Sequence, residues 1–417
     1  MASSLKQALG GNLRQYGIMG ALALVIILFT ITTGGKLLSP ANVSSLIGQN
    51  AYVLIMALGM IMVIIAGHID LSAGSVVAFV GGICGWVMYS TNWDWPWWAG
   101  VLLALALGTL IGAWHGFWIA YVRIPAFIVT LAGMLMFRGL AIVVAGFTMA
   151  PFDDEFVAIA SKGSANIFPT IPFDGGQLGV IFQAVKSIDV FTLLVGVLAI
   201  LALVWTQFRN RASQVKHGIE PEPLGFTVGK IVVIAFCIAF ATVLLSMSAV
   251  GTPFVLVIIA VLVLVYSFVL NRTVFGRHVY AIGGNLNAAI LSGINTARTN
   301  FMIFVHMGFL EAVAAIVVVS RANAANATAG QSYELDVIAA CFIGGTAVTG
   351  GIGRVSGAMV GAVFMGVLNQ GQSIMGVPSA WQQVVKGLVL LAAVAFDLLS
   401  KRRTKLVALA GVAERSQ

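Results

Sequence analysis

The chain has 417 residues, of which 60% are hydrophobic and only 9% are charged. Soluble domains carry about 25% charged residues, so most of this surface must face lipid or other apolar helices rather than water. The net charge of +8 does not indicate nucleic-acid binding, because the basic residues lie in short segments between apolar runs and form no basic face with interleaved aromatic side chains. Composition therefore predicts an all-α membrane protein and argues against a soluble domain.

Apolar runs of membrane-spanning length recur from one end of the chain to the other. A helix needs about 20 apolar residues to cross the hydrocarbon layer, and the runs that meet this need are 17–33, 51–67, 74–91, 97–120, 126–147, 188–206, 229–249, 252–270, 299–320 and 381–400. A further stretch, 336–376, is broken by glycines and predicts either two short spans or one span with a re-entrant piece. We expect one transmembrane domain over 1–417, a polytopic bundle of about 10–12 helices. Gly108, Gly112 and Gly116 predict a close approach of two helices.

The distribution of lysine and arginine predicts how the bundle is oriented. With the N-terminus in the cytoplasm, most of the 22 basic residues fall on the cytoplasmic side. This orientation makes 148–187 a periplasmic insertion, 207–229 and 271–298 cytoplasmic loops, and 401–417 a cytoplasmic tail. We therefore expect a multi-pass protein of a bacterial inner membrane with both termini in the cytoplasm.

No motif in the chain predicts catalysis or cofactor binding. The sequence contains no GxxxxGKS/T nucleotide loop, no GxSxG nucleophile elbow and no HExxH metal motif. Cys84, Cys237 and Cys341 lie far apart inside apolar runs, which is typical of small buried side chains rather than of a disulfide or a zinc site. We expect a chain that is not an enzyme and that itself binds no metal or cofactor.

The second predicted cytoplasmic loop contains a short helix with defined ends. Asn285 is a good N-cap and Gly293 a natural C-terminal stop. The helix would present Leu286, Ala289 and Ile290 to the cytoplasm. Docking into a groove of a soluble partner explains these side chains better than a position on the membrane surface. The candidate coupling residues are Gly276, Arg277, Gly283, Gly284, Asn285, Leu286, Ala289, Ile290, Leu291, Ser292 and Gly293.

This loop resembles the coupling loop in the permease subunits of the ribose, xylose, arabinose and galactose ABC importers. Three further blocks extend the resemblance over most of the chain, in the family's order. They are Ile69–Ser75, Pro125–Met134 with Phe137–Gly139, and Tyr333–Cys341 leading into Ile343–Thr346. The 148–187 insertion and the 207–229 segment followed by another span look most like the xylose-type branch.

The resemblance implies a permease subunit of a binding-protein-dependent importer that carries a xylose-like pentose or a related monosaccharide into the cytoplasm. Its implied partners are a cytoplasmic ATPase subunit that binds ATP and magnesium, a periplasmic sugar-binding protein, a second copy of the chain and the lipid bilayer. Two alternatives stay open. The same architecture carries other small solutes, such as a nucleoside or a branched-chain amino acid. A secondary transporter driven by an ion gradient would need a clearly paired set of buried ionisable groups.

Polar residues within or beside the apolar runs are candidates for the translocation route. A charged residue at membrane depth costs about 2.5–3.5 kcal/mol, so Asp70 predicts either a helix cap or a group that faces a cavity. Arg138 predicts an internal ion pair or, alternatively, a sugar contact. Glu334 and Asp336, expected on the outer side, predict either a cap for a half-helix or a docking site for the binding protein. The candidate route or gating residues are Asp70, Ser72, Gly74, Arg138, Gly344, Gly345 and Thr346. The glycines among them suit broken helices that line a route, a hinge, or close packing.

Overall fold

The computed structural model describes residues 13–89, 92–218, 223–395 and 399. Nearly all regular structure in this part of the chain is helical, as expected where lipid leaves every backbone polar group to be satisfied internally. The elements in chain order are α2 (Leu13–Thr32), η1 (Lys36–Leu38), α3 (Pro40–Gln49), α4 (Ala51–Ile65), α5 (Ala73–Met88), α6 (Trp97–Ala120), α7 (Ala126–Val144), α8 (Asp154–Ser161), η2 (Ser164–Asn166), β1 (Thr170–Pro172), η3 (Gly175–Leu178), η4 (Val180–Phe182), β2 (Ser187–Asp189), α9 (Val190–Lys216), α10 (Leu224–Ser246), α11 (Phe254–Arg272), α12 (Val274–Gly284), α13 (Leu286–Leu291), α14 (Thr296–Ala322), α15 (Tyr333–Ile343) and α16 (Val355–Ile374).

Within the described residues, six helices are long and apolar enough to cross a membrane, or seven when α3 and α4 are taken as one span with a 41° bend. Shorter apolar helices over Gly17–Thr32, Ala73–Met88 and Ser379–Ala395 correspond to three more of the predicted runs. The expectation of a polytopic all-α membrane bundle is confirmed.

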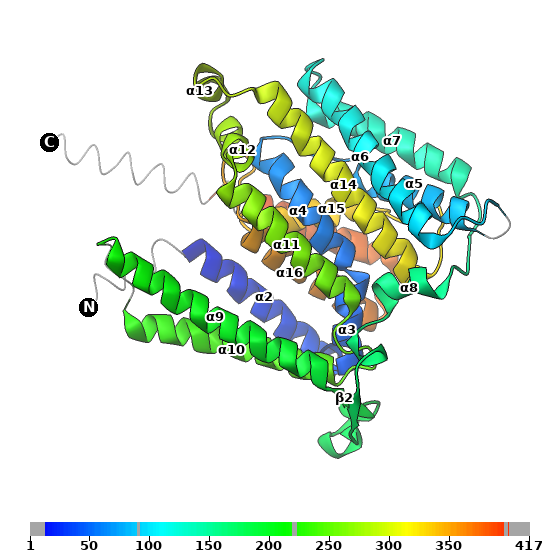
Figure 1. The fold of residues 1–417 in the computed structure, drawn as a ribbon, viewed down its shortest axis with the longest axis vertical. Coiled ribbons are helices and arrows are strands. Elements are labelled where there is room, and N and C mark those ends of the chain that lie inside the picture. The colour runs from blue at the N-terminus through cyan, green and yellow to red at the C-terminus, as the bar shows by residue number, and fades with distance from the viewer. Residues whose placement is uncertain (1–12, 90–91, 219–222, 396–398, 400–417) are drawn as a thin grey trace.

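Helices α4 and α14 form the centre of the bundle (Figure 1). Every residue of α4 except Leu54 is buried. Helix α14 packs so closely against α6 that a Cβ on Gly108 would collide with the carbonyl oxygen of Gly308, and a Cβ on Gly112 with that of Phe304. Such packing through small residues replaces the hydrophobic effect between helices in lipid, and the predicted role of these α6 glycines is confirmed.

The two ends of the bundle differ in structure (Figure 1). One end, here named the α13 side, carries α13 and the ends of α9 and α10 that the segment 217–223 joins. The other end, the α8 side, carries α8 and the antiparallel hairpin of β1 and β2, in which Thr170 pairs with Asp189. The predicted insertion 148–187 is therefore a folded element and not a featureless loop.

The predicted loop 207–229 is wrong in extent. Helix α9 continues to Lys216 and α10 begins at Leu224, so helices occupy most of this range. The polar residues that end α9 include Arg, Gln and Lys, which are good helix formers, and the helix therefore continues beyond its apolar run. The predicted tail 401–417 lies outside the described residues.

The glycine-broken stretch 336–376 holds the end of one short helix and a long one. Helix α15 has 11 residues, about 16 Å, whereas α16 has 20, about 30 Å. Helix α15 lies alongside α4, with Asp336 next to Tyr52 and Cys341 next to Ala57. The structure shows neither predicted arrangement. Helix α14 ends at the α8 side and α15 ends at the α13 side, so α15 completes a crossing that the irregular loop 323–332 begins, and α16 is a full-length helix.

Candidate functional site

The predicted coupling segment contains two helices. Thr273 caps the first, α12, by accepting a hydrogen bond at Oγ1 from the backbone N–H of Gly276 (3.1 Å). A Cβ on Gly276 would collide with the carbonyl oxygens at the end of α11, so glycine allows the sharp corner between these helices. Asn285 caps α13, accepting at Oδ1 from the N–H of Ala288 (3.0 Å), and Gly293 follows its end with φ of +79°. The predicted helix is confirmed, whereas α12 was not predicted.

The exposure of the α13 side chains agrees with the sequence prediction except at one residue. Leu286 and Ile290 are about half exposed, as predicted, and Leu291 is 88% exposed. Ala289, however, is only 3% exposed. Its expected exposure is corrected, because a six-residue helix lying on the bundle must turn one side inward, and that side carries the small residue. Arg277, Ser292 and Gly284 are exposed.

The break between α12 and α13 packs directly on the bundle. A Cβ on Gly283 would collide with the carbonyl oxygen of Ile65, the last residue of α4. That same oxygen accepts a hydrogen bond from the N–H of Gly351 (2.8 Å), which has φ of +73° in the turn between α15 and α16. Tyr280 of α12 donates its hydroxyl to the carbonyl of Gly353 (2.8 Å). We call this contact between α12, the end of α4 and the α15–α16 turn the glycine junction; it joins the α12–α13 segment to the centre of the bundle.

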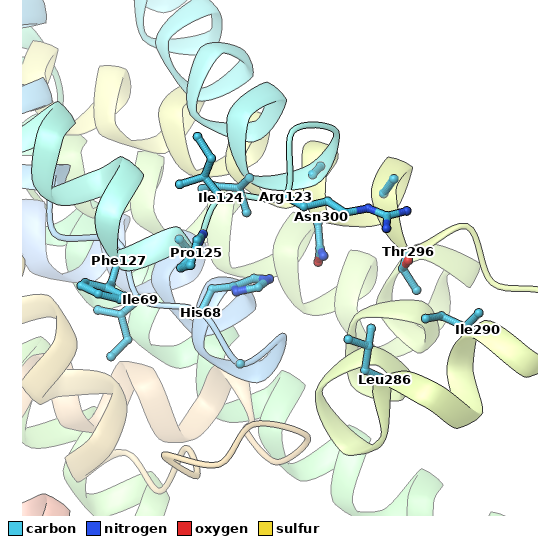
Figure 2. Close-up of a pocket in the computed structure, with 15 residues that line it drawn as sticks. His68, Ile69, Arg123, Ile124, Pro125, Phe127, Leu286, Ile290, Thr296 and Asn300 are labelled. Atoms are coloured by element: carbon cyan, nitrogen blue, oxygen red, sulfur yellow. The ribbon is translucent and has the colours of Figure 1, made fainter.

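A pocket of about 640 Å³ lies between α13, the start of α14 and the turns that follow α4 and α6. Figure 2 shows Leu286 and Ile290 of α13 on one wall, with His68, Arg123 and Asn300 on the others. Burial lowers the pKa of His68 below its ordinary value. At neutral pH the positive charge at this pocket therefore comes from Arg123.

The glycine-rich turn after α15 serves close packing. A Cβ on Gly344 would collide with the carbonyl oxygen of Gly357, so α15 and α16 touch backbone to backbone. Gly345 has φ of +90°, and Thr346 is fully buried. Of the three roles predicted for these glycines, namely lining a route, acting as a hinge and allowing close packing, the structure supports close packing, at the α13 side.

Asp70 closes a buried turn just before α5 and accepts no hydrogen bond from the helix itself, so its predicted role as a helix cap is not confirmed. It is 1% exposed, and its Oδ1 accepts hydrogen bonds from the backbone N–H (2.8 Å) and the hydroxyl (2.6 Å) of Ser72, immediately before α5. Gly74 follows in the first turn of α5, where a Cβ would collide with the carbonyl oxygen of Gly330 and with Glu334 Oε2.

Arg138 binds three backbone carbonyls. Its Nη1 donates to the oxygens of Ala327 (3.2 Å) and Ala329 (3.0 Å), and its Nη2 donates to that of Gly330 (3.2 Å). The favoured expectation of an ion pair is thus corrected: the loop between α14 and α15 supplies neutral oxygens, which a planar guanidinium contacts through several N–H groups at once.

Asp336 is the centre of a buried polar cluster. It is fully buried, and its Oδ2 accepts hydrogen bonds from Lys386 Nζ (2.9 Å), the Tyr52 hydroxyl (2.5 Å) and Asn369 Nδ2 (3.2 Å). The expectation that Asp336 receives a docking protein is corrected, because the side chain is enclosed by α4, α16 and the Ser379–Ala395 helix. Glu334, in the first turn of α15, is half-buried. The sequence did show Lys386 inside an apolar run, but it did not show its partner.

No group of three or more His, Cys, Asp or Glu side chains within the described residues is placed to hold a metal ion.

Comparison with known proteins places the chain among transport permeases. Residues 42–394 match the family model described as branched-chain amino acid transport system / permease component. The xylose transport system permease protein of Escherichia coli (strain K12) is 39% identical over 394 residues, 94% of each chain. That of Haemophilus influenzae is 37% identical over 94% of this chain and 98% of the relative. The ribose import permease protein of E. coli K12 is 30% identical over 92% of this chain and 94% of the relative.

No solved structure matches the chain. The family is one of membrane transport components rather than of enzymes, and the resemblance to sugar-importer permeases is confirmed across nearly the whole sequence. The chain belongs to the permease-component family of ABC transport systems that includes the xylose and ribose permeases.

Proposed function

We propose that this chain is the membrane subunit of a binding-protein-dependent importer for xylose or a related pentose, driven by a separate ATPase. The names of its relatives support a sugar as the cargo. In this proposal the α13 side faces the cytoplasm and the α8 side the periplasm of a bacterial inner membrane. The basic residues near the ends of α9, α11 and α14 on the α13 side support that orientation.

The observation that carries the proposal is the exposure of apolar residues on α13. Leu291 is 88% exposed at the tip of a capped helix that rests on the glycine junction. An exposed apolar residue at the end of a fixed helix is suited to enter a groove on a soluble partner. The partner ATPase would hold ATP and magnesium, and α13 would be its contact with this chain.

The glycine junction supplies a path for force. Closure of two ATPase domains would move α13 and α12 together, because Asn285 alone separates the two helices. Gly283 and Gly351 both contact the end of α4, so a displacement there reaches α4 and the α15–α16 turn. Paired with a second copy, such a movement would open the bundle alternately to each side.

The remaining candidate residues support this movement in different ways. Asp70, Ser72 and Gly74 would hold the start of α5 beside the route, and Arg138 would hold the loop against it. We assign Gly344, Gly345 and Thr346 to the packed turn that receives the displacement. The binding protein would dock on the α8 side, where the insertion 148–187 is exposed.

The test is uptake of labelled xylose into proteoliposomes that contain the assembled transporter, with ATP hydrolysis measured in parallel. Leu291→Asp should lower uptake at least tenfold and disconnect hydrolysis from the binding protein, while the assembly remains folded. Leu224→Asp is the matched control, since it makes the same change at a 54% exposed leucine on the α13 side, at the start of α10 and outside α12 and α13. Normal uptake by the Leu291→Asp protein would refute the docking role.

Two further readouts separate the alternatives. Uptake that persists without ATP, and that collapses with an uncoupler, would indicate a secondary transporter. Competition by unlabelled ribose, leucine or a nucleoside identifies the cargo class, and a transporter that ignores pentoses but takes up leucine would refute the sugar assignment.

A further inference from the structure

The loop between α14 and α15 enters the bundle from the α8 side. Its start is tied to that side, because Ala325 and Met149 exchange two backbone hydrogen bonds (3.0 Å each) and Asn323 accepts one from Phe152 (2.8 Å). From there it descends to Gly330, whose backbone touches that of Gly74 at the start of α5. Ser332, just before α15, has φ of +63°, in the left-handed region. The chain here has no helical hydrogen-bonding pattern to satisfy its backbone groups.

Two contacts place this loop at hydrocarbon depth. Arg138, which holds the loop through three carbonyls, lies about 18 Å from the first residue of α7 and about 9 Å from its last. Tyr333, where α15 begins, stacks on Tyr52 with ring centroids 3.6 Å apart. Tyr52 is in turn about 20 Å along α4 from Ile65 at the α13 side.

Despite this depth, part of the loop is exposed in the single chain. Thr328 and Gln331 are exposed, and Glu334 is half-buried with one carboxylate oxygen, Oε2, that is buried and accepts no hydrogen bond. Irregular backbone and polar side chains at this depth are not tolerated against lipid, and they occur only where protein covers them or where they line a water-filled cavity.

We propose that Thr328, Gln331 and Glu334, held in place by Arg138, form one wall of the aqueous route. The wall presents the hydroxyl of Thr328 and the side-chain amide of Gln331 to the solute, with the half-buried carboxylate of Glu334 beside them. These groups exchange hydrogen bonds with the hydroxyls of a neutral sugar and disfavour an anion beside the carboxylate. The sugar part of this inference rests on the function proposed above; the aqueous part does not.

Cysteine accessibility in proteoliposomes of the assembled transporter tests the wall. The parent carries Cys237→Ala, which removes the exposed native thiol and leaves the buried Cys84 and Cys341. Thr328→Cys and Gln331→Cys are then treated with a membrane-impermeant methanethiosulfonate reagent that carries a trimethylammonium group. Val143→Cys is the matched control, because Val143 is 81% exposed on α7, five residues from Arg138 and about 140° around the helix from it.

We expect both loop thiols to react at least tenfold faster than the Val143→Cys thiol, and millimolar xylose to slow the reaction severalfold. Rates no faster than the control would overturn the aqueous wall. Slow reaction together with a disulfide between two copies through Thr328→Cys would also overturn it, and would show that a second copy covers the loop. A fast reaction that leucine or a nucleoside slows, but xylose does not, would support the aqueous wall and refute a sugar as the solute.

Discussion

Replacing Lys386 by methionine removes the cation that faces Asp336 and keeps most of the apolar stem of the side chain. The lysine side chain is 16% exposed and that of the aspartate 0%, with Nζ and Oδ2 2.9 Å apart. Removing one partner of a buried pair costs about 3–5 kcal/mol, since an uncompensated charge stays behind. Tyr52 and Asn369 still donate to the same oxygen, so we expect a loss in the free energy of unfolding near the lower bound, about 3 kcal/mol.

The assay is SDS-induced unfolding in mixed micelles, followed by circular dichroism, for Lys386→Met, Asp336→Asn and the double variant. The double variant should be more stable than Lys386→Met alone, because no buried charge is left unpaired, with a coupling energy of about 0.5–3 kcal/mol. Leu388→Met on the same helix, at a 60% exposed position, should change stability by less than about 0.5 kcal/mol. A loss below about 1 kcal/mol for Lys386→Met, or strictly additive single effects, would refute the reasoning.

Three further outcomes are expected. Gly283→Ala should destabilise the fold by about 1–3 kcal/mol and reduce uptake, because its Cβ meets the α4 carbonyl. Gly284→Ala, with open space around it, should leave the free energy of unfolding unchanged. Equal losses of stability in the two variants would contradict the junction. Ala289→Asp should lower the yield of folded protein, since it buries a charge, while Leu291→Asp should not, as size-exclusion chromatography will check. Arg138→Met should lower the free energy of unfolding in the same assay, because it removes charge-assisted hydrogen bonds worth about 1.5–3 kcal/mol each. Unchanged stability would mean that the loop between α14 and α15 keeps its conformation without Arg138.

Local features of the sequence were sufficient to predict α13. An Asn N-cap, two preceding glycines and a following glycine define a helix end to end, because capping involves residues only two or three positions apart. Helix α12 escaped prediction since its eleven residues include three glycines, which disfavour a helix in isolation. Its stability comes from Tyr280 and Gly283 packing on the end of α4, which no local pattern reveals.

By itself the sequence determined that the chain spans a membrane many times, where most of its helices run, and which loop holds the short capped helix α13. Hydropathy and capping are properties of residues close together in the chain, so no tertiary structure was needed for these predictions. Only the tertiary structure decided which groups meet. Arg138 finds its carbonyls 189 to 192 residues further on, and Asp336 finds Lys386 50 residues away. Both sets of partners follow from how the helices pack, because a buried charged group is stable only where the folded bundle places a polar partner within hydrogen-bonding distance.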